Sequence, residues 1–165
     1  MSAPLFSVLP AEWNAHCDPL RTVRRAVFVD EQGVPEALEW DELDGLCRHV
    51  LAVDARGEGI GAGRLTPDGR IGRMAVLKAW RGKGVGSAIL VALLQAAERE
   101  GRTTVTLHAQ THAIGFYARH GFAAEGPEFL EADIPHRMMS LILPGRPSGR
   151  QMPAGPRSHA GRSDK

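Results

Sequence analysis

The sequence predicts an α/β (α+β) fold, in which helices flank a mixed sheet. Two observations favour this class. In the first half of the chain, short apolar runs are separated by turns rich in glycine, proline and aspartate, a pattern typical of antiparallel strands. In the second half, strand and helix patterns alternate, as in strand–helix–strand units. The length of 165 residues and the hydrophobic share of 43% suit one domain with a substantial core.

The first strand and the first helix are expected near the N-terminus. The apolar run at residues 5–9 predicts a short strand that Pro10 ends. Asp18 followed by Pro19 indicates a helix start, because aspartate caps a helix well and proline fits the first helical position. This helix should end by Gly33.

The remaining elements follow from hydrophobic periodicity and turn residues. The expected strands are residues 49–54, 60–66, 70–76, 103–109 and 138–143, with a further strand that starts at residues 122–124, and the expected helices are residues 87–100 and 113–119. Alternating glycines at residues 59–63 fall inside one of these strands, so they do not indicate a ligand site.

The segment between the strand at residues 70–76 and the helix at residues 87–100 is rich in glycine. A glycine-rich turn at a helix start leaves backbone N–H groups unpaired, and the helix dipole makes that end positive. Glycine also lets the backbone approach an anion closely. The sequence therefore predicts a pyrophosphate-binding site made of Arg81, Gly82, Lys83, Gly84, Val85, Gly86 and Ser87.

The spacing of these glycines differs from two common phosphate-binding motifs. A P-loop requires Gly-x-x-x-x-Gly-Lys-Ser/Thr, which the chain does not contain. The dinucleotide-binding motif requires Gly-x-Gly-x-x-Gly after the first strand of a parallel unit. Gly82, Gly84 and Gly86 instead alternate and follow several earlier strands.

Two motifs resemble the signatures of the GNAT family of N-acetyltransferases. Arg81, Gly84 and Gly86 form Arg-x-x-Gly-x-Gly, the form of that family's coenzyme-A-binding motif. Residues 110–122 contain Tyr-x-x-x-Gly-Phe at their end, like the family's second signature. The similarity covers about residues 5–143.

Within that family, residues 27–35 and 134–136 resemble the YjcF/ElaA-like branch. The resemblance implies an acetyltransferase domain over residues 1–143 with a GNAT-like, mostly antiparallel central sheet. It also implies a V-shaped splay between the strands at residues 70–76 and 103–109. Dimers are common in the family, so the resemblance allows a homodimer.

The activity that the resemblance implies is transfer of an acetyl group from acetyl-CoA, as co-substrate, to a primary amine by direct attack. The amine would belong to a small molecule or a peptide. The arm of coenzyme A would lie along Met74, Ala75 and Val76, and a backbone N–H near Val76 would hold the developing oxyanion. Gln110 stands where the family often has asparagine, and it can hydrogen-bond to the same arm.

Tyr117 is the only tyrosine in the chain. By resemblance its hydroxyl lies near the sulfur of coenzyme A, where it would protonate the departing thiolate as a general acid. The alternative is an amphipathic aromatic side chain that covers the core beside Phe116.

A base must take a proton from the acceptor, because an alkylammonium with a pKa of about 10 is almost fully protonated at pH 7. The favoured candidates are Glu31, at the end of the first helix, and His136, just before the last strand. Further candidates are Asp41, Asp44, His49 and His108. The acidic residues Glu39, Asp41, Glu42 and Asp44 could attract a cationic acceptor or form a solvated loop surface.

Other functions receive little support from the sequence. Cys17 and Cys47 are isolated, so we expect neither a metal site nor an acyl-enzyme. Residues 1–9 lack a secretory pattern and no segment suits a bilayer span, so a cytoplasmic protein without membrane contact is expected. Residues 144–165 form a basic tail rich in Pro, Gly and Arg that is expected to be disordered. Nucleic-acid binding through that tail is the weakest hypothesis.

One alternative to an enzyme stays open at this point. A non-catalytic acyl-CoA-binding or sensor domain would keep the phosphate site and transfer nothing. The sequence indicates neither the acceptor nor which residue is the base, and it does not indicate the oligomeric state.

Overall fold

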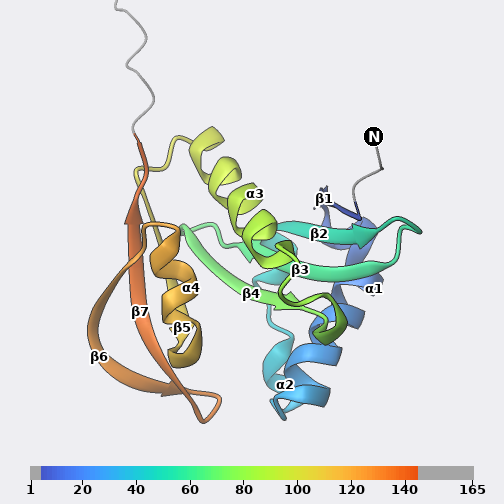
Figure 1. The fold of residues 1–165 in the computed structure, drawn as a ribbon, viewed down its shortest axis with the longest axis horizontal. Helices are drawn as coiled ribbons and strands as arrows, with labels where there is room; N and C mark the ends of the chain where they lie inside the picture. The colour runs from blue at the N-terminus through green and yellow to red at the C-terminus, as the bar shows by residue number, and fades with distance from the viewer. Residues whose placement is uncertain (1–4, 145–165) are drawn as a thin grey trace, which may run out of the picture.

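The computed structural model describes residues 5–144, and the tail expected beyond Pro144 lies outside these residues. Seven strands in the described part form one sheet in the order β1-β2-β3-β4-β5-β7-β6 (Figure 1). Every neighbouring pair is antiparallel except β4 and β5. The strands are β1 (Phe6–Ala11), β2 (Arg48–Asp54), β3 (Gly59–Leu65), β4 (Arg70–Val76), β5 (Thr104–Gln110), β6 (Ala123–Glu131) and β7 (Ile134–Ile142).

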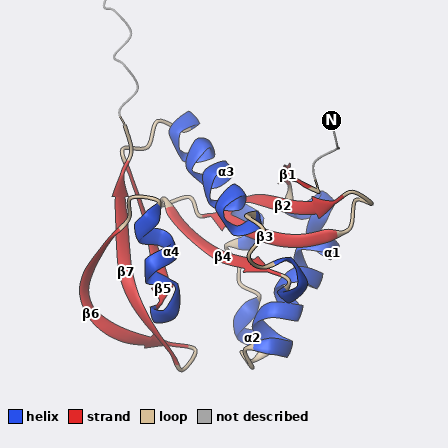
Figure 2. Cartoon of the chain, in the orientation of Figure 1, coloured by secondary structure: helices blue, strands red, loops and turns tan. Residues whose placement is uncertain are grey.

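Helices lie on both faces of the sheet (Figure 2). α1 (Trp13–Arg24) continues into a π-helix, η1 (Arg25–Glu31), while α3 (Val85–Arg99) lies on the other face. No helix within residues 5–144 combines the length and the apolar character needed to cross a membrane. The shorter helices are α2 (Glu36–Glu39), η2 (Asp44–Leu46), η3 (Lys78–Trp80), η4 (Thr111–Ala113) and α4 (Ile114–Arg119).

Two glycines in β3 let α3 approach the sheet closely. A Cβ at Gly61 would lie 2.7 Å from Cδ1 of Ile89, and a Cβ at Gly63 would lie 2.8 Å from Cγ2 of Ile89 and 2.9 Å from Cδ1 of Leu93. Ile89 and Leu93 are both fully buried. These glycines therefore serve helix packing, in agreement with their predicted place in a strand.

β4 and β5 pair along only part of their length. Their register joins Arg70 to Thr106 and Ile71 to Leu107, and no later pair follows. Beyond these residues the two strands diverge, and the sheet opens into two halves (Figure 1). The mixed, mostly antiparallel sheet and its opening confirm the predicted fold class.

A β-bulge in β4 lies where the opening begins. The register with β3 shifts between Ala62 and Arg64, and Arg73 adopts a φ of 47°. A left-handed backbone is uncommon for a residue with a side chain, and it persists only where the surrounding structure fixes it. Here the bulge sets the direction of the part of β4 that borders the opening.

Two expectations near the N-terminus are wrong in detail. β1 passes through Pro10 instead of ending there, which an edge strand tolerates because one row of its N–H groups pairs with no neighbour. α1 begins at Trp13, not at Asp18. Non-helical angles at His16 (φ −125°, ψ 16°) kink the helix, so Pro19 lies in the first turn after the kink.

The sequence located the last two strands but not their full extent. It indicated only the start of β6, near residues 122–124, and β6 runs to Glu131, while β7 begins at Ile134 instead of residue 138. In the sequence, Gly126 and the proline after it indicate a break, so the sequence does not indicate that the strand continues. In the structure β6 continues through them, and its register with β7 shifts at this place. His136 therefore lies inside β7, not before it.

Candidate functional site

A cavity of about 720 Å³ lies at the opening between β4 and β5. Its walls come from η1 and the turn after it, from β4 and β5, from α4, and from the β6–β7 hairpin. The predicted site residues that line it are Met74, Ala75, Val76, Arg81, His108, Gln110, Tyr117 and His136. The predicted residues 82–87 and Glu31 are not among the lining residues.

The start of α3 presents a row of unpaired backbone donors. Gly82 and Gly84 have φ values of 74° and 84°, and Gly84 is the N-cap. The first bond at this end runs from the Ala88 N–H to the Gly84 carbonyl, 3.1 Å away. Within the described part of the chain, the N–H groups of residues 82–87 find no acceptor. A Cβ added at Gly82 or Gly84 would meet no atom within 4 Å, so the turn is open to a ligand.

Arg81 joins the end of η1 to the end of β4. Its guanidinium forms a two-pronged ion pair with Glu31, in which Nη1 lies 2.8 Å from Oε1, and its Nε donates to the Val76 carbonyl at 3.1 Å. The hydrogen bond from Arg81 lowers the pKa of Glu31. Glu31 is therefore a weak proton acceptor in this arrangement.

The other two polar residues of the glycine-rich segment contact neighbouring elements. The Lys83 ammonium lies 5.1 Å from the ring centroid of Trp80, within reach of a cation–π interaction. The Ser87 hydroxyl lies 3.1 Å from Nε2 of His120, which caps the end of α4. This contact ties the start of α3 to the helix that carries Tyr117.

Residues 74–76 form the β4 side of the opening. β3 holds them on one side, through the pairs Ala62–Ala75 and Gly61–Val76. On the other side β5 pairs with β4 no further than Ile71. The backbone of this segment therefore borders the cavity, and the binding of a ligand arm along it stays a prediction.

Tyr117 faces Met74 across the cavity from α4. Its hydroxyl donates a hydrogen bond to the Met74 sulfur at 3.7 Å, and the Phe116 ring packs edge-on against it at 5.0 Å. Burial raises the pKa of Tyr117 to about 12. The hydroxyl is therefore protonated at neutral pH and can act as a proton donor.

Gln110, the last residue of β5, reaches across the opening to Gln32. Its Nε2 donates to Oε1 of Gln32 at 3.0 Å. Gln32 follows η1 and also lines the cavity. The sequence analysis did not select Gln32, although it lies in the segment of residues 27–35 that carries part of the family resemblance.

His136 lies on β7, opposite Gln110 in the register with β5. Its Nδ1 is 2.6 Å from the carbonyl oxygen of Ile134, so Nδ1 carries the proton and donates it, and Nε2 keeps a free lone pair. Oε2 of Glu131 lies 3.6 Å from that Nε2. The other oxygen of Glu131 is 3.2 Å from Nδ1 of His108.

Glu131 was missed because the sequence analysis identified only the start of β6, at residues 122–124, and not its continuation. The alternation of Phe129 and Glu131 after a proline was the signal that could have found it. Phe129 stacks on His136 at 5.9 Å and lies edge-on to His108 at 5.0 Å, which fixes both rings beside the carboxylate.

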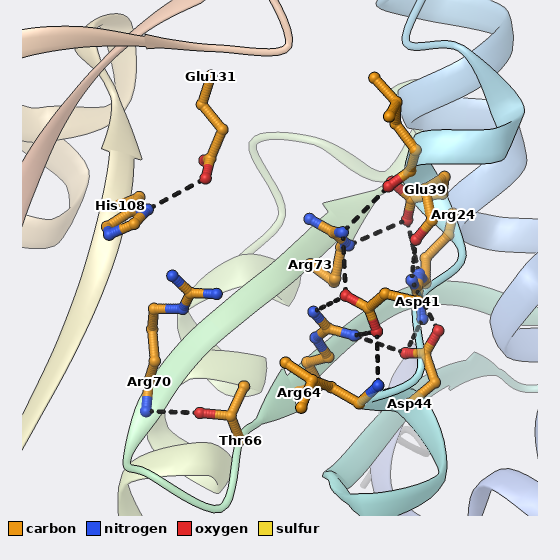
Figure 3. A network of polar contacts seen from close by, with 12 residues as sticks. Arg24, Glu39, Asp41, Asp44, Arg64, Thr66, Arg70, Arg73, His108 and Glu131 are labelled. Atoms are coloured by element: carbon orange, nitrogen blue, oxygen red, sulfur yellow. Dashed lines mark hydrogen bonds and ion pairs between the residues drawn. The ribbon is translucent and has the colours of Figure 1, made fainter.

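The acidic segment at residues 39–44 is not simply a solvated loop surface, because only Glu42 of its four carboxylates is exposed, so that expectation is wrong for the other three. Three of its carboxylates pair with arginines of α1, β3 and β4 in a buried network (Figure 3). Arg24 is only 1% exposed and lies 2.7 Å from both Glu39 and Asp44. Arg64, 2% exposed, lies 2.7 Å from Asp41 and 2.8 Å from Asp44.

This network argues against three of the further candidates for the base. Asp41 accepts two hydrogen bonds from Arg64, which hold its pKa at about 2. Asp44 is held between Arg24 and Arg64. His49 is buried, its Nε2 lies 2.8 Å from the Asp44 carbonyl oxygen, and burial lowers its pKa. None of these three side chains is among the residues that line the cavity.

Comparison with known proteins gives a consistent result. The model of the acetyltransferase (GNAT) domain matches residues 17–143. The uncharacterized N-acetyltransferase YjcF of Bacillus subtilis is 42% identical over 121 residues, which cover 71% of this chain and 86% of that protein.

Two solved structures share the fold. An acyl-CoA N-acyltransferase from Pseudomonas aeruginosa is 34% identical and superposes with a TM-score of 0.73 over 82% of this chain and 98% of its own. ElaA of Escherichia coli is 28% identical, with a TM-score of 0.72 over the same shares of the two chains, 82% and 98%. The similarity to YjcF and ElaA agrees with the branch that the sequence resembled.

Proposed function

The chain belongs to the GNAT acetyltransferase family, and we propose that it transfers an acetyl group from acetyl-CoA to the nitrogen of a primary amine by direct attack. The observation that carries this proposal is the row of unpaired N–H groups at residues 82–87, which directly follow Arg81, a residue that lines the cavity together with Tyr117 and His136. Helix-start amides of this kind suit a diphosphate.

The residues present fit coenzyme A as a donor. The amides of residues 82–87 would bind its diphosphate, with Lys83 adding positive charge nearby. Arg81, whose guanidinium is engaged by Glu31, would instead keep η1 and β4 together at the mouth of the cavity. The β4 edge at Met74, Ala75 and Val76 offers backbone N–H and C=O groups to the amide-containing arm of coenzyme A. The side-chain amides of Gln110 and Gln32, which are hydrogen-bonded to each other, could bind the same arm.

The reaction needs one proton donor and one proton acceptor on opposite sides of the thioester. As the amine nitrogen attacks the carbonyl carbon, a C–N bond forms and the C–S bond breaks. A backbone N–H near Val76 would hold the oxyanion. Tyr117 would give its proton to the departing sulfur, since its hydroxyl is protonated at pH 7. Burial raises the pKa of this tyrosine to about 12, so it is a weaker acid than an exposed tyrosine, and its position beside the sulfur, not its acid strength, supports the role.

Of the two bases that the sequence favoured, the geometry supports His136. Its Nε2 has a free lone pair, it lines the cavity, and Glu131 lies beside it to stabilise the cation that forms when it takes a proton. Glu31 is held by Arg81, its pKa is lowered, and it is not among the cavity-lining residues.

The test is turnover with a panel of primary amines. Purified protein with acetyl-CoA should release free coenzyme A only when an amine is present, and mass spectrometry should find one acetyl group on the amine nitrogen. If thiol release is slow, independent of amine and unaffected by the Tyr117→Phe change, the chain is a sensor domain and not a transferase.

A further inference from the structure

We infer that the acceptor amine also carries an acidic group, a carboxylate or a phosphate, and that Arg70 and Arg73 bind this group. The inference rests on the proposed function and concerns the acceptor end of the same cavity. Both arginines lie on β4 and line the cavity, on the other side from His108 and Glu131 (Figure 3).

Arg73 is held at the cavity wall at a cost in backbone strain. Its φ of 47° would suit glycine better, yet a long cationic side chain stands there. Its Nη2 reaches Asp41 at 3.3 Å, while its Nε is 3.6 Å from Glu39, beyond hydrogen-bond distance. That Nε is buried beside Glu39 and is closed to a ligand. Nη1 forms no hydrogen bond within the described residues, because the hydrogen bonds that Arg73 makes there all use Nη2, so this donor remains for a ligand.

Arg70 has more donors to offer. Its backbone N–H is bound by the Thr66 hydroxyl at 3.0 Å, but its guanidinium forms no hydrogen bond or ion pair within the described residues. Figure 3 shows this guanidinium directed into the space between Arg73 and His108. A planar guanidinium with free donors suits the two oxygens of a carboxylate or a phosphate.

The buried ion-pair network does not supply a partner for Arg70. In the buried network, Arg24, Arg64 and Arg73 face Glu39, Asp41 and Asp44, so three positive charges meet three negative ones. Arg70 is not part of this balanced set. The carboxylate near it is Asp68, whose pKa is lowered by the Thr66 hydroxyl and also by Arg70, but Asp68 does not line the cavity, so Arg70 is the positive charge that the network leaves without a partner on the cavity wall. On the opposite wall, Glu131 supplies a carboxylate beside His136.

The two walls are therefore complementary to a molecule with an ammonium at one end and an acid at the other. The amine would approach Glu131 and His136, where it loses its proton, and the acid would lie against Arg70 and Arg73. A purely cationic acceptor, such as a polyamine, would bring positive charge to Arg70 in a partly desolvated place, which is unfavourable.

The test uses four amines of similar length that differ at the far end: butylamine, 1,4-diaminobutane, 4-aminobutanoate and 3-aminopropylphosphonate. Two quantities are measured for each: kcat/KM with acetyl-CoA, and affinity for the coenzyme-A-loaded protein by titration calorimetry. We expect the two acidic probes to exceed the other two by about tenfold or more in both quantities. The acidic probe with the higher kcat/KM and affinity indicates whether the natural acceptor carries a carboxylate or a phosphate.

Three variants locate the effect. Arg70→Gln removes the free guanidinium, and Arg73→Gly removes the other one while placing a residue that favours positive φ at the bulge. Each should lower kcat/KM for the acidic probes by about tenfold, mainly by raising KM. In the same variants, kcat/KM for butylamine should change by less than about twofold. The control is Arg56→Gln, in the exposed β2–β3 turn, which should behave as wild type.

The outcomes are distinguishable from failure of the proposed function. Equal or better use of butylamine or diaminobutane would overturn the inference and leave the transferase intact. Equal losses for acidic and neutral probes in Arg70→Gln would overturn it too. If no amine is acetylated, the proposed function fails, and the calorimetric preference for acidic probes, with its loss in Arg70→Gln, still decides whether this end of the cavity binds an acid.

Discussion

The hydroxyl of Tyr117 on α4 donates a hydrogen bond to the sulfur of Met74 on β4, 3.7 Å away, across the opening of the sheet. A thioether is a weak acceptor, so this bond orients the hydroxyl without holding it strongly. A thiolate produced between the two elements would be a much better acceptor for the same proton. The contact thus places a protonated phenol at the position where the proposed reaction releases sulfur.

Replacing Tyr117 with phenylalanine should lower kcat by about 10²–10⁴-fold, because the leaving thiolate loses its proton donor. The affinity for coenzyme A should change little, since the change removes one hydroxyl and no phosphate contact. Stopped-flow turnover and calorimetry measure the two quantities. A variant with wild-type kcat would mean that this side chain only covers the core beside Phe116.

Replacing His136 with glutamine should lower kcat by about 10²–10³-fold at pH 7, because nothing then accepts the amine proton. The loss should shrink at pH 10, where about half of an ordinary alkylamine is already neutral. A pH series of kcat for both proteins checks this. Glu128→Gln, on the exposed part of β6, is the control. A deficit that is equally large at pH 7 and pH 10 would remove His136 from the role of base.

Asp41 should stabilise the protein in a pH-dependent way. Its pKa is lowered from an ordinary value of 3.8 to about 2 by the hydrogen bonds from Arg64, so the folded state favours the charged form. The contribution is complete above pH 5 and is lost as the pH falls from about 4 toward 2. Asp41→Asn should therefore lower the free energy of unfolding by about 1–2 kcal/mol at pH 7 and by less at pH 3.

Urea unfolding of both proteins at pH 7, 4 and 3 measures that difference. Asp54→Asn serves as a control for removing a surface charge, because Asp54 is the last residue of β2 and its carboxylate bonds only to nearby backbone N–H groups. A difference between wild type and Asp41→Asn that stays the same from pH 7 to pH 3 would show that the Arg64 pair does not control stability.

The sequence predicted the elements with strong local signals. Alternating apolar residues and turn residues located β2, β3 and β4 to within a residue or so, and the glycine-rich segment after β4 identified the start of α3. These features arise from residues close together in the chain, so their physical causes are visible in the sequence. The family resemblance supplied the opening of the sheet, which local patterns cannot reveal.

The acceptor side of the site depends on contacts that are distant in sequence. Arg64 meets Asp41 from 23 residues away, and Arg24 meets Asp44 from 20 residues away. A run of acidic residues resembles a solvated loop until the fold brings arginines to it. Likewise Glu131 reaches His136 only because β6 continues past Gly126 and Pro127, where sequence patterns indicate a break.

The central claim is that the backbone N–H groups at the start of α3 bind the diphosphate of coenzyme A, and Gly84→Glu tests it most directly. A carboxylate placed in this open turn should repel the diphosphate. Gly57→Glu is a matched control, because Gly57 has a φ of 82° against 84° for Gly84, and both would place a Cβ in open space. Titration calorimetry with coenzyme A should show at least about a hundredfold loss of affinity for Gly84→Glu and none for Gly57→Glu. Equal affinity in Gly84→Glu and wild type would contradict the claim, and the proposed activity with it.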